Sequence, residues 1–374
     1  MKLSKIFIYF TFIAIFWSVA SCVEPFKMDF KPNTSLFVVE ANITDEISER
    51  SYVSLKTTYT QNTEVYDEYE TKAKVELIIN DSQSITLSEK EKGFYYLPST
   101  FTPQIGLAYQ LKISLFDNKQ YISGKEYLPS KAPAIDKVYQ TFVPNAIKTE
   151  LQTLNPGHFI YLDYFDNLTE KNLYQFSYTL WESQAYCAYC PAGSIYISSA
   201  VGCVQNNYNN VAFDYRCTNP CWEIIQSSDI NINNDLLTNG KKVLGKLVAK
   251  IPFYQTTNSL IEVQIASISS GYYAYQKLIE EQAQSNGGLA DTPPAAIIGN
   301  IKNMSNANEP VIGYFALKRV SSKRYKIDRT DAKGQQTSLL GHAAVDEPAN
   351  PIGRPPTAPC VISKSRTSIQ PKGW

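Results

Sequence analysis

The sequence has few of the side chains on which most enzymes and metalloproteins depend. Its 374 residues include only 2 histidines and 3 methionines. Histidine titrates near neutral pH and is the commonest metal ligand, so chemistry that needs clustered imidazoles has little material here. An excess of charge is also absent, because 35 Lys and Arg balance 35 Asp and Glu. A protein that binds nucleic acid needs a basic face to neutralise phosphates, and this composition argues against that class.

Catalytic motifs are missing as well. The sequence has no G-x-S-x-G elbow, no H-E-x-x-H, no phosphate-binding glycine loop and no dinucleotide fingerprint. The segment Asp229–Asp235 resembles the start of a calcium-binding EF-hand loop, but Asn234 stands where the turn glycine belongs and Gly240 where the bidentate glutamate belongs. Asp163 and Asp166 could pair for glycoside hydrolysis, yet a chain of this length offers such pairs by chance. We reject the EF-hand and predict no catalytic residue, no metal site and no cofactor.

A long apolar run occurs at the N-terminus. Met1–Ser21 has a basic start and an apolar stretch from Ile6 to Ala20, which is typical of a signal peptide and too short for a membrane span of ~20 apolar residues. The stretch leads into Val-Ala-Ser-Cys22, the lipobox pattern of bacterial lipoproteins. We expect residues 1–21 to be removed, Cys22 to carry the lipid anchor and residues 22–34 to form a tether. The alternative is a plain secretory signal with Cys22 as an ordinary half-cystine.

The mature chain alternates apolar and polar residues in short runs rich in aromatic and β-branched side chains. This pattern predicts an all-β protein. Seven candidate strands within residues 35–128 suit a small β-sandwich. They are Leu36–Ile43, Tyr52–Thr58, Lys74–Ile79, Ser84–Leu87, Gly93–Leu97, Ala108–Leu115 and Gln120–Tyr127. The prolines of Pro129–Pro133 cannot donate to a strand ladder, so this segment is the predicted domain boundary.

A second β-rich domain is predicted over residues 134–334. Its candidate strands are Phe159–Tyr164, Leu173–Trp181, Val243–Ile251, Ser259–Ile268, Ala296–Ile301 and Val311–Val320. Gly271–Gln284 lacks internal Gly and Pro and is followed by Asn286-Gly287-Gly288, which predicts one helix. Residues 335–374 contain six prolines and little periodicity, so we expect an extended tail packed on the second domain.

Six cysteines remain besides Cys22. Cys360 lies in the tail, and five lie in a predicted insertion, residues 185–222, without good strand character: Cys187, Cys190, Cys203, Cys217 and Cys221. An even count in an exported chain favours disulfides, and six cysteines allow 15 pairings. If all are oxidised, the odd number in the insertion requires Cys360 to reach back and pin the tail. Crossed pairings within the insertion stay as admissible as local ones.

Zinc and redox chemistry are the rival interpretations of these cysteines. Cys187-x2-Cys190 and Cys217-x3-Cys221 have a knuckle-like spacing. Zinc thiolates are commoner in reducing compartments, whereas the leader directs this chain out of the cytosol. A redox Cys-x2-Cys pair lies at the N-terminus of a helix that follows a strand, and Cys187-x2-Cys190 does not have this placement in the sequence. We therefore favour disulfides.

Two further groups of residues are weak candidates for a site. Glu64–Glu70 combines acidic residues with Tyr66 and Tyr69 between two predicted strands. It is either a solvated loop or a partner-contact loop, since tyrosine supplies contact area at small entropic cost. His158 and His342 could each belong to a site, but lone histidines are far more often structural.

Short motifs along the mature chain resemble those of one known family. They are Cys22–Phe26, Leu36–Glu46, Ala73–Leu77, Gly93–Tyr95, Cys221–Glu223, Gly299–Ile301, Gly313–Phe315 and the ending Cys360–Trp374. On these residues the chain is similar to the DUF4249 family of Bacteroidota outer-membrane lipoproteins, a domain of unknown function. It departs from the family at Ala41, where members typically have Gly. The first domain also resembles immunoglobulin-like and transthyretin-like sandwiches of bacterial surface proteins.

The resemblance implies a role in the cell envelope. Family members are usually encoded beside TonB-dependent receptors and are thought to be accessory lipoproteins of uptake or envelope assemblies, with no assigned catalytic residues. We therefore expect a non-enzymatic binding protein, anchored in the outer membrane by its lipid and facing the cell surface, with the periplasmic face as the alternative. The expected partner is an outer-membrane β-barrel receptor. The alternative is a glycan- or peptide-processing enzyme or a solute-binding protein at the cell surface.

Overall fold

The computed structural model describes residues 35–46, 51–61, 64–148, 154–168, 171–206, 210–284, 297–348 and 356–374. Cys22 and the leader lie outside these residues. Within the described ranges, strands dominate and a single helix occurs, which confirms the all-β prediction. None of the described helical residues forms a segment long and apolar enough to cross a membrane.

The chain forms two compact units. The smaller contains residues up to Ser35 together with Thr58–Asp67. Its described part is mainly the tip of the hairpin between β2 (Tyr52–Gln61) and β3 (Glu64–Tyr69). The larger unit contains Leu36–Thr57 and Glu68–Trp374 and holds two β-sandwiches and a disulfide-rich insertion.

The first sandwich packs two sheets around one apolar core. One sheet has the order β22-β9-β8-β4-β5 with β10 beside β8, and the other is the β23-β1-β2-β7-β6 part of an 11-stranded sheet. In β4 (Lys74–Ile79), Val75, Leu77 and Ile79 are buried and alternate with outward residues, because successive side chains of a strand point to opposite faces. The other strands here are β1 (Ser35–Thr44), β5 (Gln83–Thr86), β6 (Ser88–Glu91), β7 (Phe94–Tyr96), β8 (Ala108–Ser114), β9 (Gln120–Ser123), β10 (Glu126–Tyr127) and β22 (Ile301–Asn303).

Residues from late in the chain complete this first sandwich. β1 pairs in parallel with the first half of β23 (Val311–Ile327), from Phe37 opposite Val311 to Thr44 opposite Lys318. β22 pairs with β9, and residues of both late strands belong to the first core. Residues 35–128 therefore do not supply the whole core. The domain boundaries at residues 128 and 134 remain a prediction.

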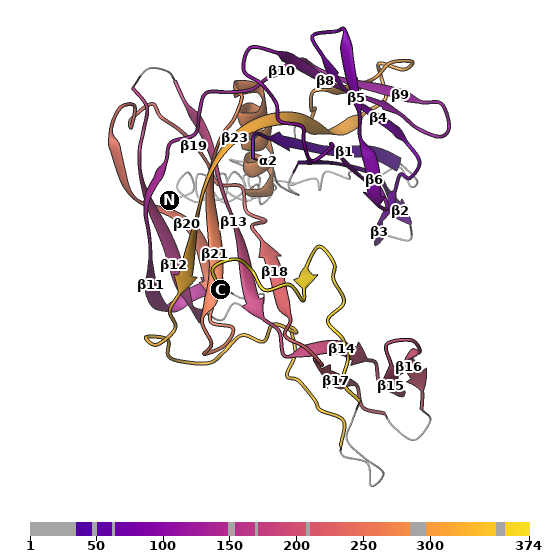
Figure 1. The fold of residues 1–374 in the computed structure, drawn as a ribbon, viewed down its shortest axis with the longest axis vertical. Helices are drawn as coiled ribbons and strands as arrows, with labels where there is room; N and C mark the ends of the chain where they lie inside the picture. Colours follow the sequence, from indigo (N-terminus) through magenta and orange to yellow (C-terminus); the bar gives the residue numbers. More distant parts are fainter. Residues whose placement is uncertain are drawn as a thin grey trace, which may run out of the picture. The chain divides into compact units, whose positions relative to one another are not determined.

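The second sandwich uses the remainder of the same large sheet. Its strands β24-β18-β13-β21-β23, with β19 beside β13, share an apolar core with the three-stranded sheet β11-β12-β20. The second half of β23 pairs antiparallel with β21, so β23 contributes to both sandwiches (Figure 1). The bounds are β11 (Ile135–Lys148), β12 (Leu154–Phe165), β13 (Leu173–Ser183), β18 (Trp222–Gln226), β19 (Ile232–Asn234), β20 (Lys242–Pro252), β21 (Ser259–Ser267) and β24 (Arg366–Thr367).

The helix prediction is confirmed, and several strands were missed. Helix α2 spans Ser270–Gln284 and buries Tyr272 in a small cluster with Ala266 and Ala316. β11 was missed because its residues are mostly exposed or half-buried and show no clean alternation. The insertion, expected to lack strands, forms two small antiparallel sheets of two strands each. They pair β14 (Tyr186–Cys190) with β17 (Phe213–Arg216), and β15 (Ser194–Ser198) with β16 (Gly202–Gln205).

Candidate functional site

Three disulfides brace the insertion. They join Cys187 to Cys217, Cys190 to Cys203 and Cys221 to Cys360. Two bridges lie within the insertion and the third ties it to the tail, which is the arrangement that the odd cysteine count predicts. Around these bridges the insertion has a small core of its own, formed with Tyr196, Phe213, Tyr215 and Ala358.

In the oxidised protein these disulfides also argue against zinc binding by the same cysteines. The sulfurs of Cys187, Cys217 and Cys221 lie within 4.8 Å of one another, a spacing that could suit a metal. All three sulfurs are bonded to other sulfurs, however, and zinc binds thiolates. The cluster is therefore a pair of neighbouring disulfides.

The tail is held along the insertion by polar contacts as well as by Cys360. His342 Nε2 lies 3.1 Å from Asp214 Oδ1, and the Val345 amide donates to Asp214 Oδ2 at 3.0 Å. Arg216 forms an ion pair with Asp346 at 2.8 Å. Figure 1 shows the yellow tail running beside β18 and the β14–β17 sheet. His342 thus has a structural role in fastening the tail.

His158 lies elsewhere, in the second sandwich. Its side chain is fully buried, its Nε2 lies 2.9 Å from Asp331 Oδ1 and its ring packs on Phe142 at 5.3 Å. The two histidines therefore sit beside different aspartates, and each holds late residues of the chain to a strand.

The β15–β16 hairpin exposes apolar side chains. Ile197, Val201 and Val204 are 48%, 59% and 41% exposed, and we call these three residues the hairpin patch. Val204 pairs with Ile195, so these two side chains share one face of the hairpin, and Ile197 lies at a register shift between Tyr196 and Ser198. The opposite face carries Tyr196, which packs into the small core. Exposed apolar clusters on a rigid support are typical of interaction surfaces.

The segment with Tyr66 and Tyr69 is a strand, so the expectation of a loop was wrong. Glu64–Tyr69 pairs with β2, and its Val65, Tyr66 and Tyr69 have high β propensity. Tyr66 is 40% exposed and stacks on Tyr59, with ring centroids 5.8 Å apart. Tyr66 therefore stays accessible on its hairpin.

Tyr69 has a packing role. Its ring lies 5.4 Å from that of Phe94, and its Cβ would lie 2.7 Å from a Cβ added at Gly93. The tyrosine thus fills the space that the glycine leaves. Its half-buried ring is less suited than Tyr66 to contact a partner.

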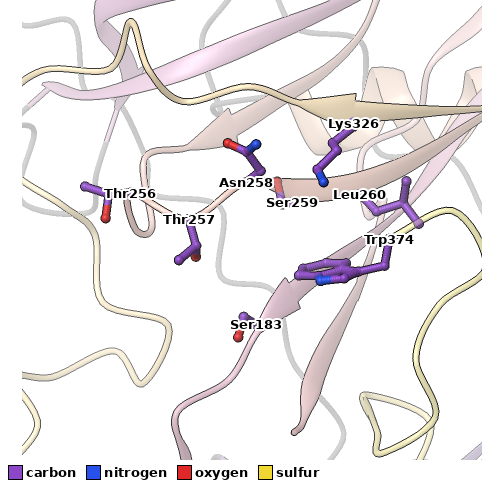
Figure 2. A pocket seen from close by; sticks show the side chains of 8 residues that line it. All are labelled: Ser183, Thr256, Thr257, Asn258, Ser259, Leu260, Lys326 and Trp374. Carbon is purple, nitrogen blue, oxygen red and sulfur yellow. The ribbon is translucent and has the colours of Figure 1, made fainter.

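A polar cleft of about 470 Å³ opens beside the second sandwich (Figure 2). Figure 2 shows the indole of Trp374 and the side chain of Lys326 near Leu260, with Ser183 and Thr257 on the other side. The complete lining is Ser183, Thr256, Thr257, Asn258, Ser259, Leu260, Lys326 and Trp374. Ser259 Oγ is buried there without a hydrogen-bond partner. Lys326 is the one titratable side chain of the lining, so the cleft is better suited to binding than to acid–base catalysis.

A fully buried ion pair supports the wall of this cleft. Arg329 and Glu182 are both 0% exposed and are joined by two hydrogen bonds. Arg329 Nη1 also donates to the carbonyl oxygens of Gln255 at 3.1 Å and Thr257 at 3.3 Å. These bonds hold the β20–β21 turn, from which three of the lining residues come. Sequence reasoning missed this site because Ser183, the turn and Trp374 are far apart in the chain.

Several motif residues meet in a buried polar cluster at the first sandwich. The Asn300 side chain accepts from the Phe315 amide at 2.8 Å and donates to the Phe315 carbonyl at 2.9 Å, as a strand neighbour would. It also donates to Glu126 at 3.2 Å, and Tyr314 donates to the same carboxylate at 2.7 Å. Burial raises the pKa of Glu126, while these hydrogen bonds lower it. The cluster ties β10 to β23.

A model described as Domain of unknown function (DUF4249) matches residues 23–324. The chain belongs to the DUF4249 family. The DUF4249 match covers the insertion and most of both sandwiches, whereas β24, Cys360 and Trp374 lie beyond it. No curated protein matches the chain.

Proposed function

We propose that this DUF4249 protein is a non-enzymatic binding component of an outer-membrane assembly. In this proposal Cys22 carries a lipid anchor, the folded part faces the cell surface and the partner is a β-barrel receptor of the TonB-dependent type. The observation that carries the proposal is the hairpin patch, which is apolar, exposed and fixed to the fold by three disulfides.

Rigid support is what makes this patch suitable for a partner. Association costs conformational entropy, and a surface that is already ordered loses less of it. The Cys190–Cys203 bridge fixes β16 to β14 next to the patch. Disulfides persist in exported proteins, which fits the proposed location.

The test is recovery of the partner from native membranes. After mild detergent extraction, the wild-type chain should bring down a β-barrel protein in equal amount. The double variant Ile197→Asp, Val204→Asp should lose most of it, because two charges would be buried unpaired at the interface. Phe116→Asp is the matched control, since Phe116 is 83% exposed on the first sandwich. Recovery of the wild-type chain alone would contradict the proposal.

The anchor and the orientation have separate tests. Cys22→Ser should abolish incorporation of labelled palmitate and release the chain from membranes. Protease treatment of intact cells should remove the mature protein if it faces outward. Full protection would place it on the periplasmic side and leave the anchor intact.

A second candidate function is binding of a polyhydroxylated solute in the cleft. Trp374 offers a flat apolar face, and the hydroxyl and amide groups around it can bond to sugar hydroxyls. A titration of oligosaccharides followed by tryptophan fluorescence should saturate in the wild-type chain and fail in Trp374→Ala. A turnover abolished by one carboxylate substitution would instead favour an enzyme.

A further inference from the structure

Two connections at one end of the second sandwich are bonded to each other. One follows β12 and the other, residues 235–241, joins β19 to β20. The Asp166 amide donates to the Lys241 carbonyl at 3.0 Å. The Asp235 amide donates to the Asn172 carbonyl at 3.1 Å, and the Asn172 amide returns a bond to Asp235 Oδ2 at 2.7 Å.

These connections bury two carboxylates close to each other. Asp166 is 0% exposed and Asp235 is 4% exposed. The two carboxylates are near enough for the charge of Asp235 to act on that of Asp166. In the described part of the chain, no Lys, Arg or His forms an ion pair with either residue. Buried carboxylates normally have a cationic partner or lose their charge.

Unsatisfied oxygen atoms gather at the same place. Tyr164, Asp166, Thr238 and Asn239 each bury an oxygen without a hydrogen-bond partner, and they supply four of the eight such oxygens found in the described residues. The Gly240 and Asn167 amides lower the pKa of Asp166 but do not reach hydrogen-bond geometry with its Oδ2. Buried polar atoms are satisfied in the great majority of cases, so this concentration points to a missing partner.

A tight turn brings Thr238 and Asn239 close to Asp235 in the backbone. The Thr238 and Asn239 amides both donate to the Asp235 carbonyl at 2.8 Å, so the chain turns tightly there. Tyr174 donates to Asp166 Oδ1, which leaves Oδ2 as the open atom of that carboxylate. Every open atom is an oxygen, and none is nitrogen or sulfur.

We propose that this cluster binds a calcium ion, with Asp166, Asp235, Thr238 and Asn239 as ligands and water completing the shell. Calcium takes six to eight oxygen ligands in flexible geometry, whereas magnesium demands a regular octahedron and keeps most of its water. A divalent cation would also neutralise the two buried carboxylates. The site is distinct from an EF-hand, because its ligands come from two connections.

Thermal unfolding of the full chain tests the proposal. Calcium at about 5 mM, above the ~10⁻³ M dissociation constants of weak extracellular sites, should raise Tm by about 2–4 °C over the same sample in chelator. Magnesium at the same concentration should give a smaller shift. Asp166→Asn should lose the calcium shift, whereas Asp81→Asn, at an exposed aspartate paired with Lys125, should keep it.

Terbium provides a readout that does not depend on the variant folding. Terbium is a hard cation that replaces calcium, and excitation of Tyr164 and Tyr174 should sensitise its emission in the wild-type chain. Calcium should displace it. Absence of both terbium emission and a calcium shift in the wild-type chain would overturn the proposal, as would a calcium shift that survives in Asp166→Asn. A shift produced equally by magnesium would overturn the assignment to calcium.

Discussion

At Gly313 two backbone segments approach so closely that no side chain fits. Gly313 has φ +121°, and a Cβ there would lie 1.8 Å from the Val39 carbonyl oxygen. A Cβ at Gly299 would lie 1.4 Å from the Gly313 carbonyl oxygen. These two motif glycines therefore mark the place where β1, β23 and the segment before β22 meet.

Gly313→Ala should lower the free energy of unfolding by about 2–5 kcal/mol, since it combines an unfavourable φ with a clash against backbone. Gly106→Ala is the matched control, because Gly106 has φ +81° but nothing within 4 Å of the added Cβ. The control should cost about 1–2 kcal/mol. Urea unfolding measures both, and equal losses would show that the close approach is unimportant.

Glu126 makes the stability of the first sandwich depend on pH. Its folded pKa is raised by burial above its unfolded value of ~4.3, so the folded state binds the proton more tightly. Compared with a neutral side chain at this position, Glu126 therefore contributes most to stability at pH values below its unfolded pKa. This contribution falls as the pH rises from the unfolded pKa through the folded pKa. Glu126→Gln, measured against wild type by urea unfolding, should gain relative stability as pH rises through this window. A difference that does not change with pH would contradict this assignment.

Among the elements, those with local signals could be predicted and those defined by distant partners could not. Gly271–Gln284 was recognisable because its ends carry their own stop signals, and the helix begins one residue earlier. β23 extends seven residues past the predicted Val320 because its polar second half is stabilised by pairing with β21, which composition does not show. The cysteine count indicated the bond to Cys360 but not which cysteine in the insertion receives it.

Cys360→Ser tests how strongly the tail depends on its bridge. The bond to Cys221 closes a separation of 139 residues, for which the loop-entropy model gives roughly 4–5 kcal/mol before strain and residual structure reduce it. The variant should leave Cys221 reactive to alkylation and release the tail to limited proteolysis. Fragments from the first sandwich should stay protected. A tail that remains resistant would show that Arg366–Glu223 and the β24–β18 pairing hold it without the bridge.

In the whole molecule, the first sandwich cannot close until the chain is nearly complete. Its core needs Ile301, Val311, Phe315 and Leu317 in addition to the early strands. A nascent chain stalled so that it ends near residue 298 should therefore expose β1 to pulse proteolysis, whereas one that extends past Ile327 should protect it. Protection of the shorter chain would show that the early strands fold alone.

The parallel partnership of β1 and β23 has a consequence for export. A protein threaded through a membrane from its N-terminus presents its early strands first, and here β1 must wait for a partner from near the other end. Until then its edge and apolar face are available to other chains, the condition under which strands aggregate. If the chain is exported as proposed, we expect its secretion to depend on a holding chaperone that releases the chain late, when both partners have crossed.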